Sequence, residues 1–306
     1  MSTPRLSILI LSWNAPRHIT ACLDSLMAAT ATGDVEIIVI DNASSNQLAH
    51  TLRQRYPAIR LVCNQTNVGY ALGNNQAYQL ARGHYSMLLN QDTVVTPATV
   101  QQLISFLDSH PGYAAVTPVL RNPDGSLQYY MHRRWPTVTG LLLALLHKRW
   151  PRFQPKLVQR YLYLDQTWQQ DFDIEQAAGA CLMLRRSAIV ELGDLFDVRH
   201  FPLYYNDVDL CYRLAQHHQT IRCLTTASIV HDKGTSVRTL PGTFNALEYA
   251  YASLWFFKKH GQWFDFWLLR LAYITLFTIL VLFRPAYYKA WLTAVTLKYY
   301  GIFPVK

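Results

Sequence analysis

Residues 35–45 read VEIIVIDNASS, a run of branched apolar residues that stops at a cluster of polar side chains. A similar run, LSILILSWN, occupies residues 6–14, and the residues between the two have the apolar spacing of a helix. Such runs predict buried strands, and strands that alternate with helices predict parallel β-α-β units. We therefore expect an α/β sandwich whose functional loops lie at the carboxyl ends of the strands.

The alternating pattern continues along the chain. A third cycle is predicted at residues 59–89, with a helix at about residues 71–82, and a further strand is predicted at residues 178–184. A basic and apolar insert interrupts the pattern at about residues 133–160. We expect one α/β domain at residues 1–240 and a helical segment at residues 241–306.

Composition limits the class of protein. With 306 residues, of which 51% are hydrophobic, the chain can bury a full core and is not expected to be disordered. The five cysteines are scattered and form no CxxC pair, so neither a disulfide framework nor a zinc site is indicated. The first residues lack the order of a signal peptide, and we expect the protein to stay in a reducing compartment.

The net charge of +9 is concentrated in two segments. Residues 258–306 carry seven Lys or Arg and one Asp, and residues 133–160 carry seven Lys or Arg and no acidic residue. In both segments the basic residues alternate with Trp, Tyr and Leu, which favours a membrane surface. The α/β part has no basic recognition helix and no zinc spacing, so nucleic acid is not an expected partner.

The tail contains the segments expected at the membrane. Residues 244–259 have the pattern of an amphipathic helix, and residues 271–283 contain no charged residue. A transmembrane helix needs about 20 apolar residues, and Arg270 and Arg284 flank this run. We expect an in-plane or re-entrant helix pair, with a true span and a buried core helix as the alternatives.

Seven blocks of sequence occur in an order that resembles the family 2 glycosyltransferases with the GT-A fold, nearest to their rhamnosyltransferase-like branch. The resemblance covers Ser7 to Ser236. The blocks are Leu9 to Asn14 (LILSWN), Val39 to Ser44 (VIDNAS), Asn64 to Asn74 (NQTNVGYALGN), Leu88 to Thr93 (LLNQDT), Gly179-Ala180, Tyr204 to Arg213 (YYNDVDLCYR) and His231 to Ser236 (HDKGTS).

The resemblance implies a site for a nucleotide-sugar donor. Asp41 takes the place of the residue that accepts from a pyrimidine N3–H, although an Asp at this position could also cap the next helix. The loop Asn67 to Gly69 could bring backbone N–H groups close to phosphate or ribose, or could be an ordinary turn. The residues implied at the nucleotide are Ser12, Asn14, Asp41, Asn67, Gly69 and Asn90.

The resemblance also implies a metal and a catalytic base. Asn90-Gln91-Asp92 takes the place of the family's DxD motif, so Asp92 would bind a divalent cation, Mg²⁺ or Mn²⁺, with His231 approaching it from the C-terminal side. Asp207 matches the general base that deprotonates the acceptor hydroxyl. Asn206 stands where the family commonly has Glu.

The remaining implied residues concern the sugar and the acceptor. Gly179, Ala180 and Asn206 would lie near them, with tight strand packing as the other explanation of the small residues. Asp209, two residues after the base, is expected to have a structural role in the first turn of a helix.

The implied activity is inverting transfer of a sugar, with dTDP-rhamnose the best match and a UDP-sugar next, to a lipid-linked or cell-envelope glycan. The expected location is the cytoplasmic face of the inner or plasma membrane, as a peripheral or monotopic protein. The alternative is a membrane-attached protein that keeps the fold without the activity, because Asn90 and Asn206 replace two acids.

Overall fold

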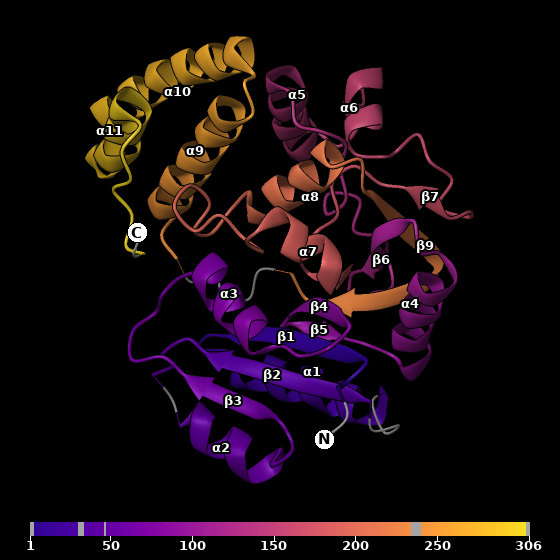
Figure 1. Ribbon diagram of the computed structural model, residues 1–306. Helices are drawn as coiled ribbons and strands as arrows, with labels where there is room; N and C mark the ends of the chain where they lie inside the picture. The colour runs from indigo at the N-terminus through magenta and orange to yellow at the C-terminus, as the bar shows by residue number, and fades with distance from the viewer. Residues whose placement is uncertain (1–2, 30–33, 46, 234–239, 304–306) are drawn as a thin grey trace.

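The computed structural model describes residues 3–29, 34–45, 47–233 and 240–303. These residues form a mixed nine-stranded sheet covered by helices on both faces, with a further group of helices beyond one end of the sheet (Figure 1). The strands are β1 (Leu6–Ser12), β2 (Val35–Asp41), β3 (Arg60–Cys63), β4 (Tyr85–Asn90), β5 (Thr93–Val94), β6 (Tyr113–Arg121), β7 (Phe172–Asp173), β8 (Cys181–Arg185) and β9 (Thr220–His231). The helices are α1 (Pro16–Ala29), α2 (Leu48–Arg55), α3 (Tyr70–Leu80), α4 (Pro97–Ser109), α5 (Val138–Arg149), α6 (Lys156–Tyr161), α7 (Arg186–Leu192), α8 (Asn206–Gln216), α9 (Gly242–Lys259), α10 (Trp263–Phe283), the 3-10 turn η2 (Pro285–Tyr287) and α11 (Tyr288–Thr296).

The sheet has a parallel half and a mixed half. Its strand order is β3-β2-β1-β4-β8-β6-β9-β5, and β7 pairs with β9. Strands β3, β2, β1 and β4 are mutually parallel, whereas β8 runs antiparallel to both β4 and β6. The predicted β-α-β opening is confirmed, and the ends of β1, β2 and β4 come together at one edge.

Alternate residues of the strands build two cores. On β1, Leu6, Ile8 and Ile10 pack with α1, α2 and α4, whereas Leu9 packs with α3, α7 and α8 on the other face. Successive side chains of a strand point to opposite faces, so a sheet covered on both sides requires strands that are apolar on both faces, and Ser7 is the one polar residue among Leu6 to Leu11 of β1. Burial on both faces fixes the parallel strands that carry the site.

Strand β6 was not expected from the sequence, because Pro118 lies in its middle. Proline lacks the N–H that a sheet ladder uses and is usually found at sheet edges or at bulges. Here the pairing of β6 with β9 shifts register between Pro118 and Val119, whose partners are Leu224 and Ser228. The irregularity therefore lies beside the residue that cannot donate, and β6 keeps its place inside the sheet.

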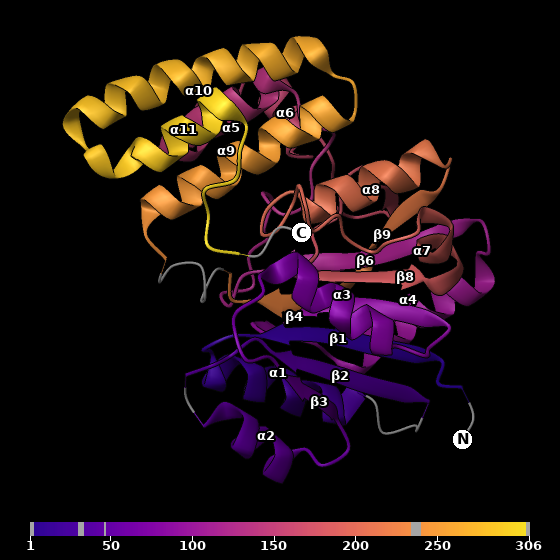
Figure 2. The same cartoon turned by 60° about the vertical axis from the view of Figure 1, so that its left-hand side comes forward.

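The insert and the C-terminal helices form a second group. Buried residues of α5, α6, α9 and α10 share one apolar cluster with Phe201 and Val208 (Figure 2). The backbone N–H of Val138, at the start of α5, donates to Asp265 Oδ1 in the first turn of α10 at 3.0 Å. The acidic residue of the basic tail thus joins the insert to the C-terminal helices.

Helices α9 and α10 differ from the expected pair. Helix α9 was expected to be amphipathic, but half of its 18 residues are buried because it packs against α10 and α11 as well as the α8 region. Helix α10 has 21 residues, is long and apolar enough to cross a membrane and is mostly exposed, so the alternative of a buried core helix does not describe it. Arg270 donates to the carbonyl oxygens of Ala294 and Val295 at the end of α11, so its charge is held within the helix pair.

Candidate active site

Three polar loops meet at the carboxyl ends of β1, β2 and β4. Ser12 pairs in register with Asp41, and Leu11 pairs with Asn90, so the ends of three sequence blocks become neighbours. This arrangement follows from the parallel direction of the three strands. The structure therefore brings together the residues that the sequence assigned to the donor nucleotide.

Hydrogen bonds join the loop after β1 to the loops after β4 and β2. Ser12 Oγ donates to Gln91 Oε1 at 2.8 Å, and Asn14 Oδ1 accepts from the backbone N–H of Ser45 at 2.8 Å. Asn14 adopts a φ of 49°, in the left-handed region that Asn tolerates better than most residues. Asp41 is buried and its Oδ1 accepts from the Ser44 N–H at 3.2 Å, so this carboxylate also organises its own turn.

Asn42 organises a further loop, Asn67 to Gly69 between β3 and α3, and was not singled out from the sequence. Its Nδ2 donates to Asn67 Oδ1 at 2.8 Å, and its Oδ1 accepts from the Val68 N–H at 3.0 Å. Asn67 Oδ1 also accepts from the Gly69 N–H at 2.9 Å. The Asn67 side-chain oxygen therefore fixes the shape of this loop. A nucleotide would be contacted by the loop that Asn67 shapes, and not by this oxygen itself.

Position 69 requires glycine because of its backbone conformation and because of the neighbouring Phe303. It precedes α3 with a φ of 87°, a conformation that favours glycine. A Cβ at Gly69 would lie 3.0 Å from Cγ of Phe303, near the C-terminus. The tail therefore returns from α11 and covers this loop.

Asp92 and His231 face each other in the place expected for a metal. Asp92 Oδ1 lies 3.3 Å from His231 Nε2, and both side chains are almost fully buried. Gln128 donates from Nε2 to the His231 carbonyl at 2.6 Å, so its Oε1, 3.0 Å from Nδ1, accepts the imidazole N–H. This contact directs the lone pair of Nε2 at the carboxylate in the neutral imidazole. Two acceptors at this distance repel unless a proton or a cation lies between them.

Gln128 was missed from the sequence, because 103 residues separate it from His231. Metal-binding histidines usually donate their other ring N–H to such a partner. Within the described parts of the chain, no three His, Cys, Asp or Glu side chains form a metal-binding group. Gly234, Thr235 and Ser236, the end of the last block, lie outside the described residues.

Asp207 lies at the start of α8, next to Gly179. Asp207 Oδ2 accepts from the Gly179 N–H at 3.1 Å, and its Oδ1 accepts from the Val208 N–H at 2.9 Å. Burial raises the pKa of Asp207 above its ordinary value, although the Gly179 N–H and the charge of Arg133 oppose that shift. A raised pKa makes a carboxylate a stronger base than a solvated Asp.

The small residues Gly179 and Ala180 precede β8. The predicted strand at residues 178–184 begins instead at Cys181, because the Gly179 N–H is directed at Asp207 and leaves the ladder. A Cβ at Gly179 would lie 3.5 Å from Asp207 Cβ, and Ala180 accepts from the Asn90 N–H at 3.0 Å. These residues connect the base to the Asn90 loop.

Tyr70 lies between the two acidic groups, and the sequence did not single it out. Its hydroxyl donates to Asn90 Oδ1 at 2.9 Å and lies 3.4 Å from the Gly179 carbonyl. Burial and the charges of Asp207 and Asp92 raise the pKa of Tyr70, so the phenol stays protonated. Asp207 and the Asp92–His231 pair therefore lie around Tyr70 in one site.

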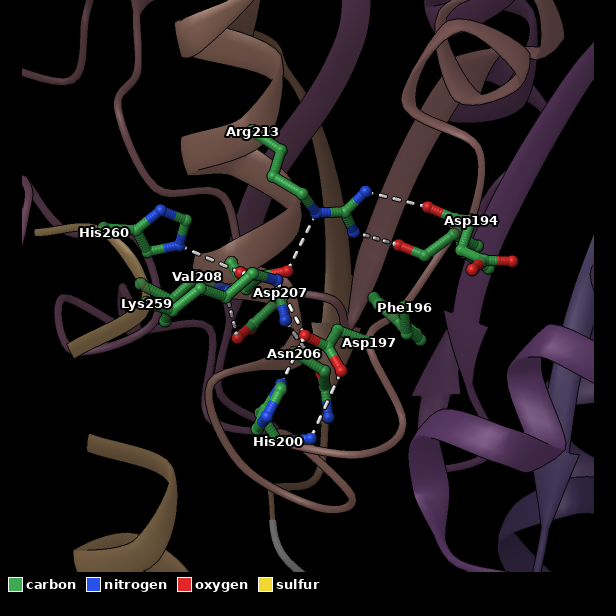
Figure 3. A network of polar contacts seen from close by, with 12 residues as sticks. Asp194, Phe196, Asp197, His200, Asn206, Asp207, Val208, Arg213, Lys259 and His260 are labelled. Atoms are coloured by element: carbon green, nitrogen blue, oxygen red, sulfur yellow. Dashed lines mark hydrogen bonds and ion pairs between the residues drawn. The ribbon is translucent and has the colours of Figure 1, made fainter. Parts of the chain in front are cut away.

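The neighbours of Asp207 on α8 have other contacts. Asn206 is buried, donates to the Leu203 carbonyl at 2.7 Å and accepts from the Asp207 N–H at 2.8 Å. Asp209 is fully buried and is contacted by Arg213, Lys259 and His260, which tie α8 to the end of α9. Figure 3 shows Arg213, Lys259 and His260 in this region. Burial alone would raise the pKa of Asp209, but His260 and the two cations lower it. These contacts agree with the structural role expected for Asp209.

Comparisons with known proteins identify the family of the chain. Residues 7–193 match the family described as Glycosyl transferase family 2. The chain is 27% identical over 273 residues to the N-acetylglucosaminyl-diphospho-decaprenol L-rhamnosyltransferase of Mycobacterium tuberculosis, with 85% of this chain and 87% of that protein covered. It is 26% identical to the O-antigen biosynthesis protein RfbC of Myxococcus xanthus, over 86% of this chain and 20% of that protein.

Two solved structures share the fold. GalNAc-T7 with UDP, GalNAc and Mn²⁺ has a TM-score of 0.55 and 16% identity, covering 75% of this chain and 44% of the other. Residues 1–349 of S. aureus TarS with UDP have a TM-score of 0.51 and 15% identity, covering 74% and 60%. At such identities the likeness shows the fold alone, which is GT-A. The family match spans more than half of the chain and includes the strand ends that build the site, so the chain belongs to glycosyl transferase family 2 and is a nucleotide-sugar glycosyltransferase.

Proposed function

We propose that this glycosyltransferase moves rhamnose from dTDP-rhamnose, with inversion, to a hydroxyl of a lipid-linked glycan. The observation that carries the proposal is the position of Asp207 and the Asp92–His231 pair around one side chain, Tyr70. An inverting transfer needs a base on one side of the sugar and charge stabilisation on the other. The two groups provide these functions within one site.

Asp207 is the proposed base. Gly179 and Val208 hold its two carboxylate oxygens through backbone N–H groups, so the side chain is fixed before the acceptor binds. As the acceptor hydroxyl attacks C1 from the face opposite the diphosphate, Asp207 takes its proton. Gly179 has no side chain beside Asp207, where a Cβ would lie 3.5 Å from Asp207 Cβ, so the acceptor sugar is placed there, with Ala180 and Asn206 as its proposed neighbours.

Asp92 and His231 are the proposed ligands of a divalent cation, Mg²⁺ or Mn²⁺. A carboxylate oxygen and an imidazole lone pair at 3.3 Å, with Gln128 fixing the tautomer, form a donor set that suits Mn²⁺. Two protein ligands leave positions for diphosphate oxygens and water. When bound, the cation would act as a Lewis acid that stabilises the departing diphosphate.

The two amides at acidic positions of the family fit their surroundings here. Asn90 accepts from Tyr70, and Asn206 donates to a carbonyl as well as accepting from a backbone N–H. A Glu at position 206 could not donate to Leu203 when ionised. These contacts favour an active enzyme over the alternative of a non-catalytic relative, because Asp92, His231 and Asp207 keep their geometry.

The choice of donor and acceptor rests on the mycobacterial relative, which is named as a rhamnosyltransferase acting on N-acetylglucosaminyl-diphospho-decaprenol. A UDP-sugar is the second candidate, because both solved relatives hold UDP. The exposed apolar helix α10 supports attachment to a membrane. The cytoplasmic face is the proposed location, because the lipid-linked acceptor would be found there.

A panel of nucleotide sugars tests the proposal. Purified protein in detergent would be given dTDP-rhamnose, UDP-N-acetylglucosamine, UDP-glucose or GDP-mannose, with an undecyl-diphospho-N-acetylglucosamine acceptor, in Mn²⁺ or in EDTA. We expect release of dTDP from dTDP-rhamnose in Mn²⁺ and a product of opposite anomeric configuration to the donor. Turnover with UDP-sugars only would show that the donor is a UDP-sugar. A product with the same anomeric configuration as the donor would contradict the role of Asp207 as the base.

A further inference from the structure

Arg133 is a half-buried cation without an acidic partner. Among the ion pairs of the described residues none includes Arg133, and its Nε is buried with no hydrogen-bond acceptor. The next residue, Arg134, has an ion pair with Asp165 at 3.0 Å and lies over the ring of Tyr163. Asp207 supplies a nearby negative charge but forms no ion pair with Arg133, so the partly buried guanidinium would still gain free energy from an anionic ligand that contacts it directly.

The backbone places Arg133 beside the catalytic base. Arg133 and Gln176 exchange two backbone hydrogen bonds of 3.1 and 3.0 Å, and the Ala178 N–H donates to His132 Nδ1 at 3.2 Å. The next N–H along the chain, that of Gly179, donates to Asp207. The two segments therefore run side by side up to the base.

Three tyrosines from three separate elements lie within electrostatic range of Arg133: Tyr161 on α6, which hydrogen-bonds with it, Tyr205 before α8 and Tyr249 on α9. The hydroxyls of Tyr205 and Tyr249 are 3.5 Å apart. Burial alone would lower the pKa of Arg133, but these tyrosines and Asp207 raise it, so the guanidinium keeps its charge. A fixed guanidinium with nearby hydroxyls is a combination that binds phosphate.

The position also fits a lipid. Tyr161 and Tyr205 belong to the apolar cluster of α5, α6, α9 and α10, and the exposed face of α10 continues from that cluster. An acceptor sugar attacked at Asp207 and joined to a lipid through diphosphate would carry its phosphates one sugar ring away from the base. Its lipid would then lie toward the apolar helices.

We propose that Arg133 binds the diphosphate of the acceptor, and that the acceptor is therefore a sugar joined directly to a diphospholipid. This inference rests on the proposed function. It specifies the sugar next to the diphosphate as the one that is glycosylated. The donor also contains a diphosphate, so the experiment must separate the two sources.

Two acceptors test the proposal: undecyl-diphospho-N-acetylglucosamine and undecyl N-acetylglucosaminide, which has the same sugar and chain without phosphate. Arg133→Met should raise KM for the first acceptor about 10- to 100-fold, the range of a charge-assisted hydrogen bond. KM for the donor and for the uncharged acceptor should stay near wild type, and Arg133→Lys should recover part of the loss. Arg160→Met, at an exposed position on α6, is the matched control and should resemble wild type.

Three outcomes would overturn the proposal: an equal loss with both acceptors, a rise in donor KM alone, or an unchanged KM in a folded Arg133→Met protein. If the wild type uses neither acceptor, the proposed function fails at its acceptor. Calorimetric binding of undecyl diphosphate in EDTA then tests Arg133 by itself. Weaker binding by Arg133→Met supports the proposal, and equal binding by wild type and variant contradicts it.

Discussion

Asp92 and Asp207 have different surroundings, which suit them to different proposed roles. Asp92 faces an imidazole whose tautomer is fixed by Gln128, which suits a cation. Asp207 is held by backbone N–H groups in a buried position that raises its pKa, which suits proton transfer. A carboxylate that binds a metal and one that takes a proton need these opposite environments.

Asp207→Asn should lower transfer by about 10²- to 10⁴-fold, because the amide cannot take the acceptor proton. The amide also has one acceptor oxygen where the carboxylate has two, so one of the bonds from Gly179 and Val208 is lost. Initial rates with saturating donor and the binding of nucleoside diphosphate are the measurements. Donor binding should persist, and near-normal transfer would place the base elsewhere, with Asp209 the next residue to test.

At this scale the sequence predicted the residues that carry charge and missed those that orient them. Asp41, Asp92, Asp207 and His231 stand in recognisable blocks. Gln128, Tyr70 and Asn42 act through hydrogen bonds to other loops, and such contacts exist only after the chain has folded. The surroundings of Arg133 could not be predicted either, because its tyrosine neighbours come from α6, from the position before α8 and from α9.

Among the secondary-structure elements, α9 connects the tail to the site. Glu248, on α9, is buried, and its Oε1 accepts from the Tyr299 hydroxyl at 2.5 Å. Its Oε2 has no partner among the described residues. Phe303, four residues after Tyr299, packs on Gly69. Glu248 therefore lies under the segment that covers the loop Asn67 to Gly69.

Glu248 predicts a pH dependence of stability. Burial raises its pKa from 4.5 to about 7. Between these values the folded state keeps a proton that the unfolded state releases, so the free energy of unfolding should fall as pH rises through this window. Glu248→Gln removes this loss, and its stability relative to wild type should grow by about 3 kcal/mol between pH 4.5 and 8.

Urea unfolding of wild type and Glu248→Gln in detergent, at several pH values from 4.5 to 8, measures this difference. Glu191→Gln, at an exposed glutamate, serves as the control and should show a much smaller change. Parallel pH curves for wild type and Glu248→Gln would show that Glu248 titrates normally in the folded protein.

The elements themselves were predicted unevenly, for physical reasons. Strands β1, β2 and β4 are apolar except for the second residue and the last residue of each, and they were found within one or two residues. Strand β6 contains Pro118, which a local pattern counts against a strand, although the bulge beside it accommodates the missing N–H. Helix α9 was found, but its burial depends on α10 and α11, which its own periodicity does not describe.

Across the whole molecule, the exposed apolar surface of α10 stands apart from the polar site. Phe264, Leu271, Leu282 and Phe283 are each at least 64% exposed. The charge of Arg270, which argued against a span in the sequence, is satisfied by the end of α11. The exposed apolar helix α10 is compatible with the membrane association that we propose from the composition of the tail.

Replacing these four α10 residues with Gln should release the protein from membranes while leaving nucleotide binding intact. Sedimentation with membranes at low and high salt measures this, and wild-type attachment should survive high salt because apolar burial is not screened. Lys289→Gln is the charge control. These substitutions are cleaner than truncation after Lys259, which would also remove His260 from Asp209. A wild-type protein that stays soluble without detergent would contradict the membrane assignment.

In the proposed function, donor binding depends on a cation that Asp92 and His231 hold at the donor diphosphate. Calorimetric titration with dTDP and UDP, in Mn²⁺ and in EDTA, tests it most directly on wild type, Asp92→Ala and the control Asp34→Ala, an exposed position at the far edge of the sheet. We predict Mn²⁺-dependent binding in wild type and Asp34→Ala, and its loss in Asp92→Ala. Unchanged Mn²⁺-dependent affinity in a folded Asp92→Ala protein would contradict the account.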